Sequence, residues 1–143
     1  MNPAQLEIIK LIPQRHPVIM IDRLEYWDEK CGKGILKIKE ENVFCSEGVL
    51  QESGLIECIA QTAAAHTGFS QLITKNSVAK GFIGSIKNLF IHSLPPVGSE
   101  IHSEIIIDNE IMGFTIILGK IYLNNTILAE CEMRIILENN IRG

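Results

Sequence analysis

The sequence predicts an α+β fold in which one long helix packs against an antiparallel sheet of about six strands. Three observations predict it. Only one long run, residues 53–69, has strong helical character. Segments rich in β-branched residues and separated by turn residues follow from residue 81 onwards, and two further strand-like runs precede the helix. A chain of 143 residues has room for one domain, so we assign residues 1–143 to a single fold.

Before the helix, the pattern predicts a short opening helix and two strands. Gln5 to Ile12 carries apolar side chains at helical spacing and stops at Pro13, so we expect one small helix followed by a loop to residue 16. The runs Val18 to Trp27 and Ile35 to Lys39 alternate as antiparallel strands do.

The long helix is expected to begin at the N-cap Ser53 and to end near Phe69, with Gly68 as its stop signal. At about 100° per residue its apolar side chains leave no wide polar face, which is typical of a helix buried on most sides. The side chains expected to be almost inaccessible are Ile56, Ile59, Ala60 and Ala63. One helix wrapped by a sheet is the hotdog fold. The alternative, an open two-layer sandwich, would leave one helix face wet and charged.

After the helix the chain is expected to form sheet only. The four predicted strands are Gly81 to His92, Gly98 to Asp108, Gly113 to Leu123 and Ile127 to Leu137. The predicted breaks between them are a loop at Pro95–Gly98 and hairpin turns at Asp108–Asn109 and Asn124–Asn125.

Composition excludes several classes of function. The net charge is −4, with 13 Lys and Arg against 17 Asp and Glu and no basic run, which argues against nucleic acid as a partner. The N-terminus lacks the pattern of a secretory signal, and no apolar stretch approaches the ~18 residues of a membrane span, so we expect a cytoplasmic protein. The four scattered cysteines predict free thiols rather than a zinc site, and no cofactor or metal is expected.

Two residues of the helix form a plausible site. Glu57 and Gln61 are one turn apart on the same side, so the amide can hydrogen-bond and orient the carboxyl group. The alternative is that Glu57 only complements the positive end of the helix dipole. His66 lies roughly 180° around the helix and ~13 Å along it from Glu57, so we expect a hydrogen-bonded core or subunit-contact histidine there. His16, His92 and His102 lie on a loop or near exposed strand ends.

Several stretches resemble FabZ-type β-hydroxyacyl-acyl carrier protein dehydratases. Residues 11–23 (LIPQRHPVIMIDR) look like the opening motif of that family, and residues 57–61 (ECIAQ) are similar to its E-x-[ML]-A-Q. Residues 82–90 followed by 96–100 resemble a strand and turn of the family, and residues 128–133 its last strand. The run AQTAAAHTG at residues 60–68 looks closest to a dehydratase-like subgroup of aryl-polyene and flexirubin pigment synthesis.

The resemblance implies a hotdog dehydratase in which Glu57 acts on the substrate hydroxyl and Gln61 orients it. The residues that it places along the acyl site are Gly48, Val49, Gly54, Phe82 and Gly84. The family also has a catalytic histidine before the helix, but the matching stretch here is shorter and has Val49 at that position. The usual acid–base pair is therefore incomplete, and His16 is the first residue to test as the missing base.

Three functions are compatible with the absence of the family's catalytic histidine. The first is a dehydratase-like enzyme with an altered acid–base pair, acting on acyl thioesters of acyl carrier protein or coenzyme A in fatty acid or pigment synthesis. The second is a hotdog thioesterase that uses one helical carboxylate. The third is a non-catalytic acyl-binding subunit of another dehydratase. In each case we expect a homodimer, or a heterodimer with another hotdog subunit, that closes the sheet edge.

Overall fold

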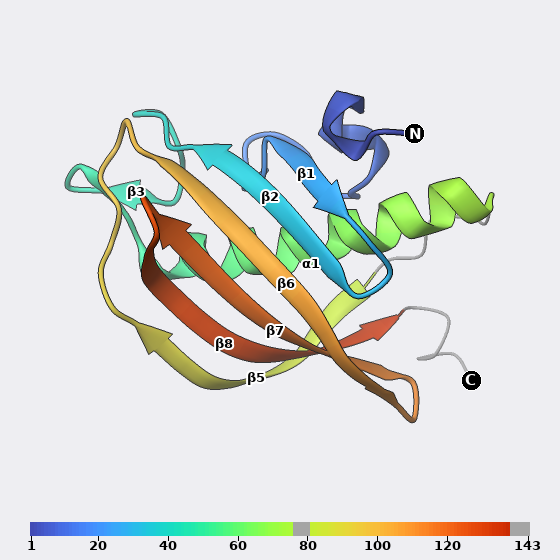
Figure 1. Ribbon diagram of the computed structural model, residues 1–143. Helices are drawn as coiled ribbons and strands as arrows, with labels where there is room; N and C mark the ends of the chain where they lie inside the picture. Colours follow the sequence, from blue (N-terminus) through green and yellow to red (C-terminus); the bar gives the residue numbers. More distant parts are fainter. Residues whose placement is uncertain (76–80, 138–143) are drawn as a thin grey trace.

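The computed structural model describes residues 1–75 and 81–137 and shows one long helix lying behind one twisted antiparallel sheet (Figure 1). The sheet has six strands in the order β1-β2-β6-β7-β8-β5. Their bounds are β1 Arg23–Trp27, β2 Cys31–Lys37, β5 Gly81–Ile91, β6 Glu100–Ile111, β7 Phe114–Leu123 and β8 Thr126–Leu137. The predicted hotdog fold of the α+β class is confirmed.

Helix α1 (Glu52–Thr74) is longer at both ends than the sequence predicts. The N-cap is Gln51 rather than Ser53, which lies in the first turn. Gly68 is not a stop signal. A Cβ atom there would lie 2.0 Å from the carbonyl oxygen of Leu11, so glycine serves the close approach of the N-terminal segment to the helix. The helix ends instead at Lys75, whose φ of 62° is left-handed.

The sheet does not wrap the helix as completely as predicted. Ile59 and Ala63 are buried, and Ile59 packs so tightly that a Cβ on Gly119 of β7 would lie 2.3 Å from its Cγ2. The prediction is wrong for Ile56 and Ala60, which stay partly accessible. These two residues belong to a helix side that neither the sheet nor the N-terminal segment covers completely. The residues of that side, here called the open helix face, are Ile56, Glu57, Ala60, Ala64 and Thr67.

The N-terminal segment forms two short 3-10 helices, η1 (Pro3–Gln5) and η2 (Ile8–Lys10), instead of the single helix predicted over Gln5 to Ile12. Eight residues are too few for a stable α-helix without strong tertiary support. The segment packs over the C-terminal half of α1 and forms a second, smaller core. The buried members of that core are Leu11, Ile12, Ile21, Leu24, Ala65 and Phe69.

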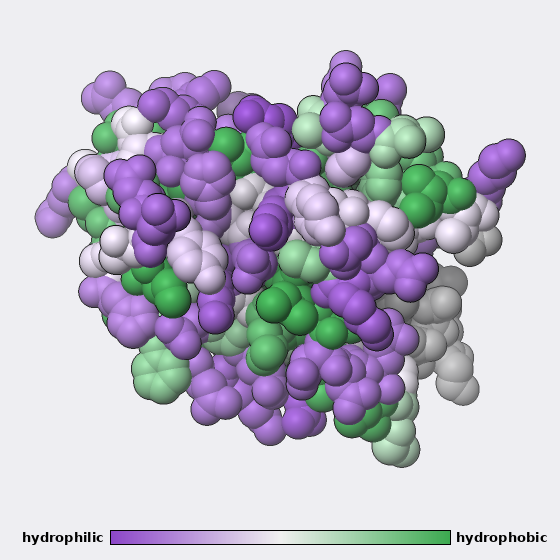
Figure 2. All heavy atoms as spheres, in the orientation of Figure 1, coloured by the Kyte–Doolittle hydropathy of each residue, from purple (hydrophilic) through white to green (hydrophobic). Residues whose placement is uncertain are grey.

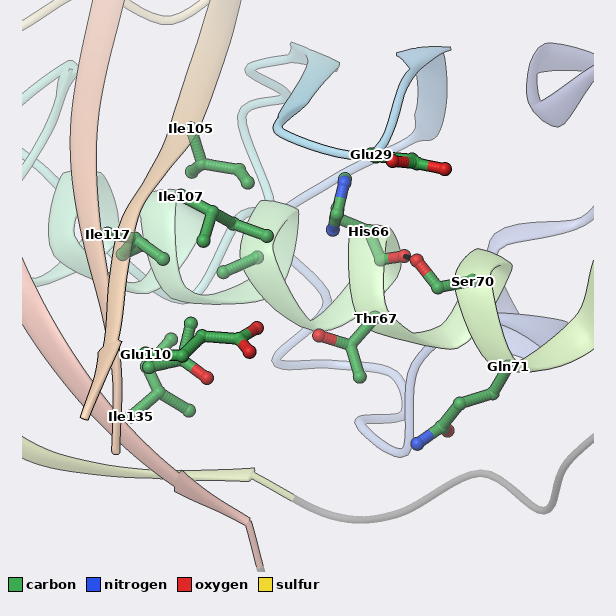
Figure 3. A pocket seen from close by; sticks show the side chains of 12 residues that line it. Glu29, His66, Thr67, Ser70, Gln71, Ile105, Ile107, Glu110, Ile117 and Ile135 are labelled. Atoms are coloured by element: carbon green, nitrogen blue, oxygen red, sulfur yellow. Dashed lines mark hydrogen bonds between the residues drawn. The ribbon is translucent and has the colours of Figure 1, made fainter. Parts of the chain in front are cut away.

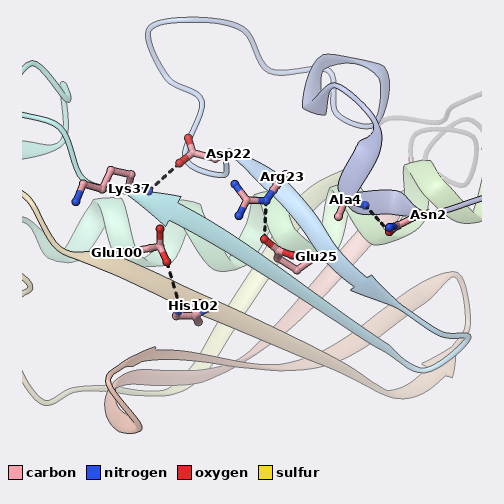
Figure 4. Close-up of polar contacts among 8 residues, drawn as sticks. All are labelled: Asn2, Ala4, Asp22, Arg23, Glu25, Lys37, Glu100 and His102. Carbon is pink, nitrogen blue, oxygen red and sulfur yellow. Dashed lines mark hydrogen bonds and ion pairs between the residues drawn. The ribbon is translucent and has the colours of Figure 1, made fainter.

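Both early strands begin elsewhere than predicted. Strand β1 starts only at Arg23, because backbone groups of residues 18–20 bond to the helix instead of to a neighbouring strand. Strand β2 starts earlier, at Cys31, because the turn before it is short: Asp28 Oδ1 accepts from the N–H groups of Lys30 and Cys31 at 2.8 and 2.7 Å. A second carboxylate, that of Asp22, accepts from the Lys37 backbone at 2.8 Å and joins residues 18–22 to β2 (Figure 4).

Two features of the connections differ from prediction. A small hairpin, β3 (Cys45–Ser46) and β4 (Val49–Leu50), precedes the helix and was not predicted. Asp108–Asn109 is not a turn. Strand β6 passes this point through an irregularity in register, and the hairpin turns at Met112–Gly113, where both φ angles are positive. The predicted turn at Asn124–Asn125 is confirmed.

The main core lies between α1 and the inner face of the sheet. Its largest fully buried side chains include Leu55, Ile59, Ile101, Ile105, Ile117 and Ile121. The outer face is mainly hydrophilic with a hydrophobic island near its middle (Figure 2). Ile106 and Leu118, which pair across β6 and β7, are exposed. No helix in the described part of the chain is long and apolar enough to cross a membrane.

Candidate active site

The buried side chain of Gln61 holds the candidate site together. It is fully buried and makes three hydrogen bonds. The amide oxygen accepts from the N–H of Met20 at 2.6 Å, and the amide nitrogen donates to the carbonyl of Val18 at 2.8 Å and to Glu57 Oε1 at 2.8 Å. Since Met20 offers only a donor and Val18 only an acceptor, the orientation of the amide is determined. Gln61 therefore both binds residues 18–20 to the helix and presents an N–H to Glu57.

Glu57 lies on the open helix face, half-buried, one turn before Gln61. The hydrogen bond from Gln61 holds the carboxylate oxygen Oε1. The other oxygen, Oε2, has no hydrogen-bond partner among residues 1–75 and 81–137. No ion pair with Lys, Arg or His involves Glu57 within the same residues. A carboxyl group held by a neutral donor, with one oxygen free, is suited to exchange a proton with a bound molecule. The predicted proximity of Glu57 and Gln61 is confirmed.

His16 is not brought to this carboxylate. It is exposed and lines a separate cavity of about 210 Å³ with Asp22, Lys37 and Lys39. In the described part of the chain, neither a hydrogen bond nor an ion pair joins His16 to Glu57. The two are linked only through the backbone, because residues 18–20 continue from His16 to the groups that Gln61 binds.

The hairpin β3–β4 places Gly48 and Val49 near the start of the helix, and Gly54 belongs to the helix itself. Gly48 O accepts from Val97 N at 2.9 Å, and Val49 pairs with Pro96. Gly54 lies in the first turn of α1, where a Cβ would be 2.6 Å from Leu50 Cδ1. The structure thus packs this hairpin directly on the helix, one turn before Glu57. The half-buried Val49 side chain carries no group that can transfer a proton.

The remaining two predicted residues lie on the edge strand β5. Gly84 sits at an irregularity in the pairing of β5 with β8, and a Cβ there would lie 3.0 Å from Ile136 Cδ1. Phe82 belongs to the same strand, but its side chain lies outside the described residues. No described hydrogen bond joins either of them to Glu57. A role in binding substrate remains a prediction for both.

His66 is buried, as expected, with 3% of its surface exposed. Its Nε2 lies 2.7 Å from the carbonyl oxygen of Asp28, and its ring stacks on Trp27 at a centroid distance of 5.6 Å. Burial lowers the pKa of His66 below its usual value, although the bond to Asp28 opposes the shift. The ring is therefore neutral near pH 7.

The cysteines do not form a reactive site. All four are free, and burial raises the pKa of Cys58 to about 12 and that of Cys131 to about 11. Thiols with such pKa values stay protonated near neutral pH, so they are poor nucleophiles. Within the described residues no group of three or more His, Cys, Asp and Glu side chains could hold a metal ion.

Fold and site together define a class: a hotdog protein that carries a glutamine-oriented carboxylate on its central helix. The comparison with protein families extends this conclusion. The family model of the ApeP dehydratase matches residues 6–142, and the chain therefore belongs to the ApeP-like dehydratase family.

Individual relatives agree with this assignment. The 3-hydroxyacyl-[acyl-carrier-protein] dehydratase FabZ of Actinobacillus pleuropneumoniae serotype 5b is 25% identical over 134 residues, which cover 89% of this chain and 86% of the relative. Among solved structures, the dehydratase heterocomplex ApeI:P from Xenorhabdus doucetiae matches with a TM-score of 0.88 and 14% identity, over 96% of this chain and 95% of that one.

A hypothetical thioesterase from Streptococcus pneumoniae, solved with coenzyme A, matches with a TM-score of 0.60 and 8% identity, over 80% of this chain and 83% of that one. At this identity the two structural matches show the fold alone. The shared fold does not distinguish a dehydratase from a thioesterase, whereas the family model assigns this chain to the dehydratases.

Proposed function

We propose that this chain dehydrates β-hydroxyacyl groups carried as thioesters on acyl carrier protein or coenzyme A. In this reaction a base removes a proton from the α-carbon, the bond between the β-carbon and its hydroxyl breaks, and an acid protonates the departing oxygen, so that water and an enoyl thioester form. Glu57 is the acid. The observation that carries the proposal is the hydrogen bond from Gln61, which orients Glu57 Oε1 and leaves Oε2 for the substrate. The names of the curated relatives support the substrate class.

The base is proposed to come from outside the helix. Val49 cannot supply it, and His66 is nine residues from Glu57, on the other side of the helix and bound to Asp28. Two sources remain: His16, in the same or in a second subunit, or a histidine of a partner hotdog subunit. A structurally similar protein exists as a heterocomplex, which supports the second source.

Two surfaces support pairing with a second hotdog subunit. Strand β5 is an edge of the sheet and exposes Ile83, Leu89 and Phe90. The open helix face is apolar around Glu57. An exposed apolar sheet edge favours addition of another strand, and a two-fold pair would make one continuous sheet. Sedimentation at micromolar concentration is expected to give at least a dimer; a 16.0 kDa monomer would contradict this pairing for the protein alone.

The test is an assay with a β-hydroxyacyl thioester of acyl carrier protein. It compares the wild-type chain, His16→Ala, and a mixture of the chain with a hotdog dehydratase encoded nearby. We expect slow or no enoyl formation by the chain alone and a clear gain in the mixture. Rapid turnover by the chain alone that survives His16→Ala would show that another residue is the base. Free thiol without enoyl product would overturn the dehydratase in favour of the thioesterase.

A further inference from the structure

The outer face of the sheet, which is turned away from helix α1, carries an apolar patch. Side chains alternate between the two faces of a strand. Ile105, Ile117 and Ile135 lie on the inner face, on the side of the helix (Figure 3). Their neighbours along β6, β7 and β8 therefore lie on the outer face, where Figure 2 shows a hydrophobic area. The residues here called the outer patch are Ile106, Ile116 and Leu118.

The outer patch is accessible in the middle of the sheet. Ile106 and Leu118 pair directly across β6 and β7, and 40% and 38% of their surfaces are exposed. Exposed apolar patches surrounded by polar residues mark contact surfaces. Pairing through the edge strand β5 would extend the sheet and leave its outer face uncovered. Covering the outer patch therefore requires a contact different from the edge pairing.

Arg134 of β8 lies next to this patch and lacks an acceptor. It pairs in register with Ile116, on the same face of the sheet. Its Nε is buried and has no hydrogen-bond partner. Its guanidinium makes no ion pair with a carboxylate among residues 1–75 and 81–137. Since arginine has only donors and buried donors are normally paired, this side chain indicates an acceptor that comes from another molecule.

A second copy of the chain offers such an acceptor in Glu132. This residue lies two positions before Arg134 on the same face, in register with Leu118, and it too makes no ion pair within the described ranges. The two positions are roughly 7 Å apart along the strand. A two-fold axis that lies parallel to the sheet and crosses β8 at Met133 exchanges them. Arg134 of each copy then faces Glu132 of the other, and Leu118 faces Ile116 in the same way.

The charges around the patch favour a second copy over a partner of one charge sign. Positive and negative side chains alternate across the next row of the sheet, in the order Lys33, Glu104, Lys120 and Glu130. A strongly acidic or strongly basic partner would meet repulsion at every second position. A surface that carries both signs can be complementary to itself when a two-fold axis brings opposite charges together.

We propose that the outer patch binds the outer patch of a second copy, sheet against sheet, with Arg134 of each copy on Glu132 of the other. Two sheets packed in this way lie about 10 Å apart, a spacing that leucine and isoleucine side chains from both faces fill. The contact is separate from Glu57 and does not depend on the dehydratase activity. Together with pairing through β5 it gives an assembly of four chains.

The test is the mass of the assembly that the full chain forms at micromolar concentration, measured by sedimentation equilibrium. Leu118→Asp places a charge in the middle of the proposed contact, at a side chain that is exposed in one copy. We expect this variant to have about half the mass of the wild-type assembly, because one two-fold contact is lost and pairing through β5 stays. Ile9→Asp, at an exposed apolar residue of η2 outside the sheet, is the matched control and should keep the wild-type mass.

Charge reversal tests the register of the contact. Arg134→Glu and Glu132→Arg each bring like charges together and should halve the mass, whereas the double variant restores opposite charges and should return to the wild-type mass. Lys30→Glu, at an exposed residue of the β1–β2 turn, controls for the change in charge.

If Leu118→Asp does not fold, the charge variants decide. Three results would overturn the proposal: a mass that Leu118→Asp leaves unchanged, a wild-type chain no heavier than this variant, or a double variant that stays at the mass of the single charge variants. The second result includes the case in which only a different protein covers the outer patch.

Discussion

The ionisable side chains in the two halves of helix α1 differ in burial and in hydrogen bonding. In the N-terminal half, Glu57 is partly exposed and receives one hydrogen bond from a neutral amide. In the C-terminal half, His66 is buried, stacked on Trp27 and bound to a backbone carbonyl. One side chain keeps a free oxygen at an open surface, and the other is fixed in its neutral form. The comparison shows that burial and hydrogen bonding leave the carboxyl group at Glu57 available for proton transfer and withhold the imidazole of His66.

The largest effect is expected at Glu57. Glu57→Gln removes the proton-donating group and keeps the shape, so the gain in enoyl formation that the chain gives in the mixture with the partner dehydratase should fall at least ~100-fold, the usual scale of acid–base catalysis. The thermal midpoint should stay unchanged or rise, because a partly buried carboxylate is removed from an apolar helix face. Glu52→Gln makes the same charge change in the exposed first turn; it should leave activity unchanged and lower the thermal midpoint slightly, because a carboxylate there complements the helix dipole. Loss of stability with intact activity would identify Glu57 as a helix-end charge only.

Gln61→Ala is expected to lower both activity and stability. The buried N–H of Met20 and the partly buried carbonyl of Val18 lose their partner, which should reduce the free energy of unfolding by about 2–4 kcal/mol. Denaturation by urea measures this loss, with the exposed Gln5→Ala as control. A loss below ~0.5 kcal/mol would show that residues 18–20 are held by other contacts.

A smaller effect is expected in the C-terminal half from Gly68→Ala. Alanine favours a helix over glycine by about 1 kcal/mol, but its Cβ would lie 2.0 Å from Leu11 O. The N-terminal segment must then move, so we expect a net loss of about 1–2 kcal/mol in the free energy of unfolding. Ser53→Ala, in the exposed first turn of the same helix, serves as control. A gain in stability would mean that the segment separates from the helix without cost.

The smallest effect concerns pH. Burial lowers the pKa of His66, so below the ordinary value of about 6.5 the unfolded chain binds a proton that the folded chain does not. Stability is therefore complete above pH ~6.5 and falls as the pH drops from there towards the lower pKa of the folded state. The carboxyl of Asp28 does not contribute in this range, because the hydrogen bond from Tyr26 lowers its pKa.

His66→Gln should flatten the slope of unfolding free energy against pH below about 6.5. Gln5→Ala, the exposed control above, should leave that slope unchanged. If the slope persists in His66→Gln, the acid sensitivity belongs to other groups.

Local patterns were sufficient for the element types and for the pair Glu57 and Gln61, because both depend on spacing along one helix or strand. They failed where a distant segment takes part. Gly68 has the composition of a helix end, but its role is set by Leu11, 57 residues earlier in the chain (68 − 11). The late start of β1 depends on backbone groups that bond to Gln61.

Trp27 is the only tryptophan of the chain, and it lies beside the C-terminal half of helix α1. Its indole N–H donates to Ser70 Oγ at 2.9 Å while its ring stacks on His66. The intrinsic fluorescence of the protein therefore originates beside the histidine, and an imidazolium in that position would quench it. Emission intensity thus reports the protonation of His66. In the described part of the chain Trp27 has no contact with Glu57, so this emission follows the C-terminal half of the helix separately from the candidate active site.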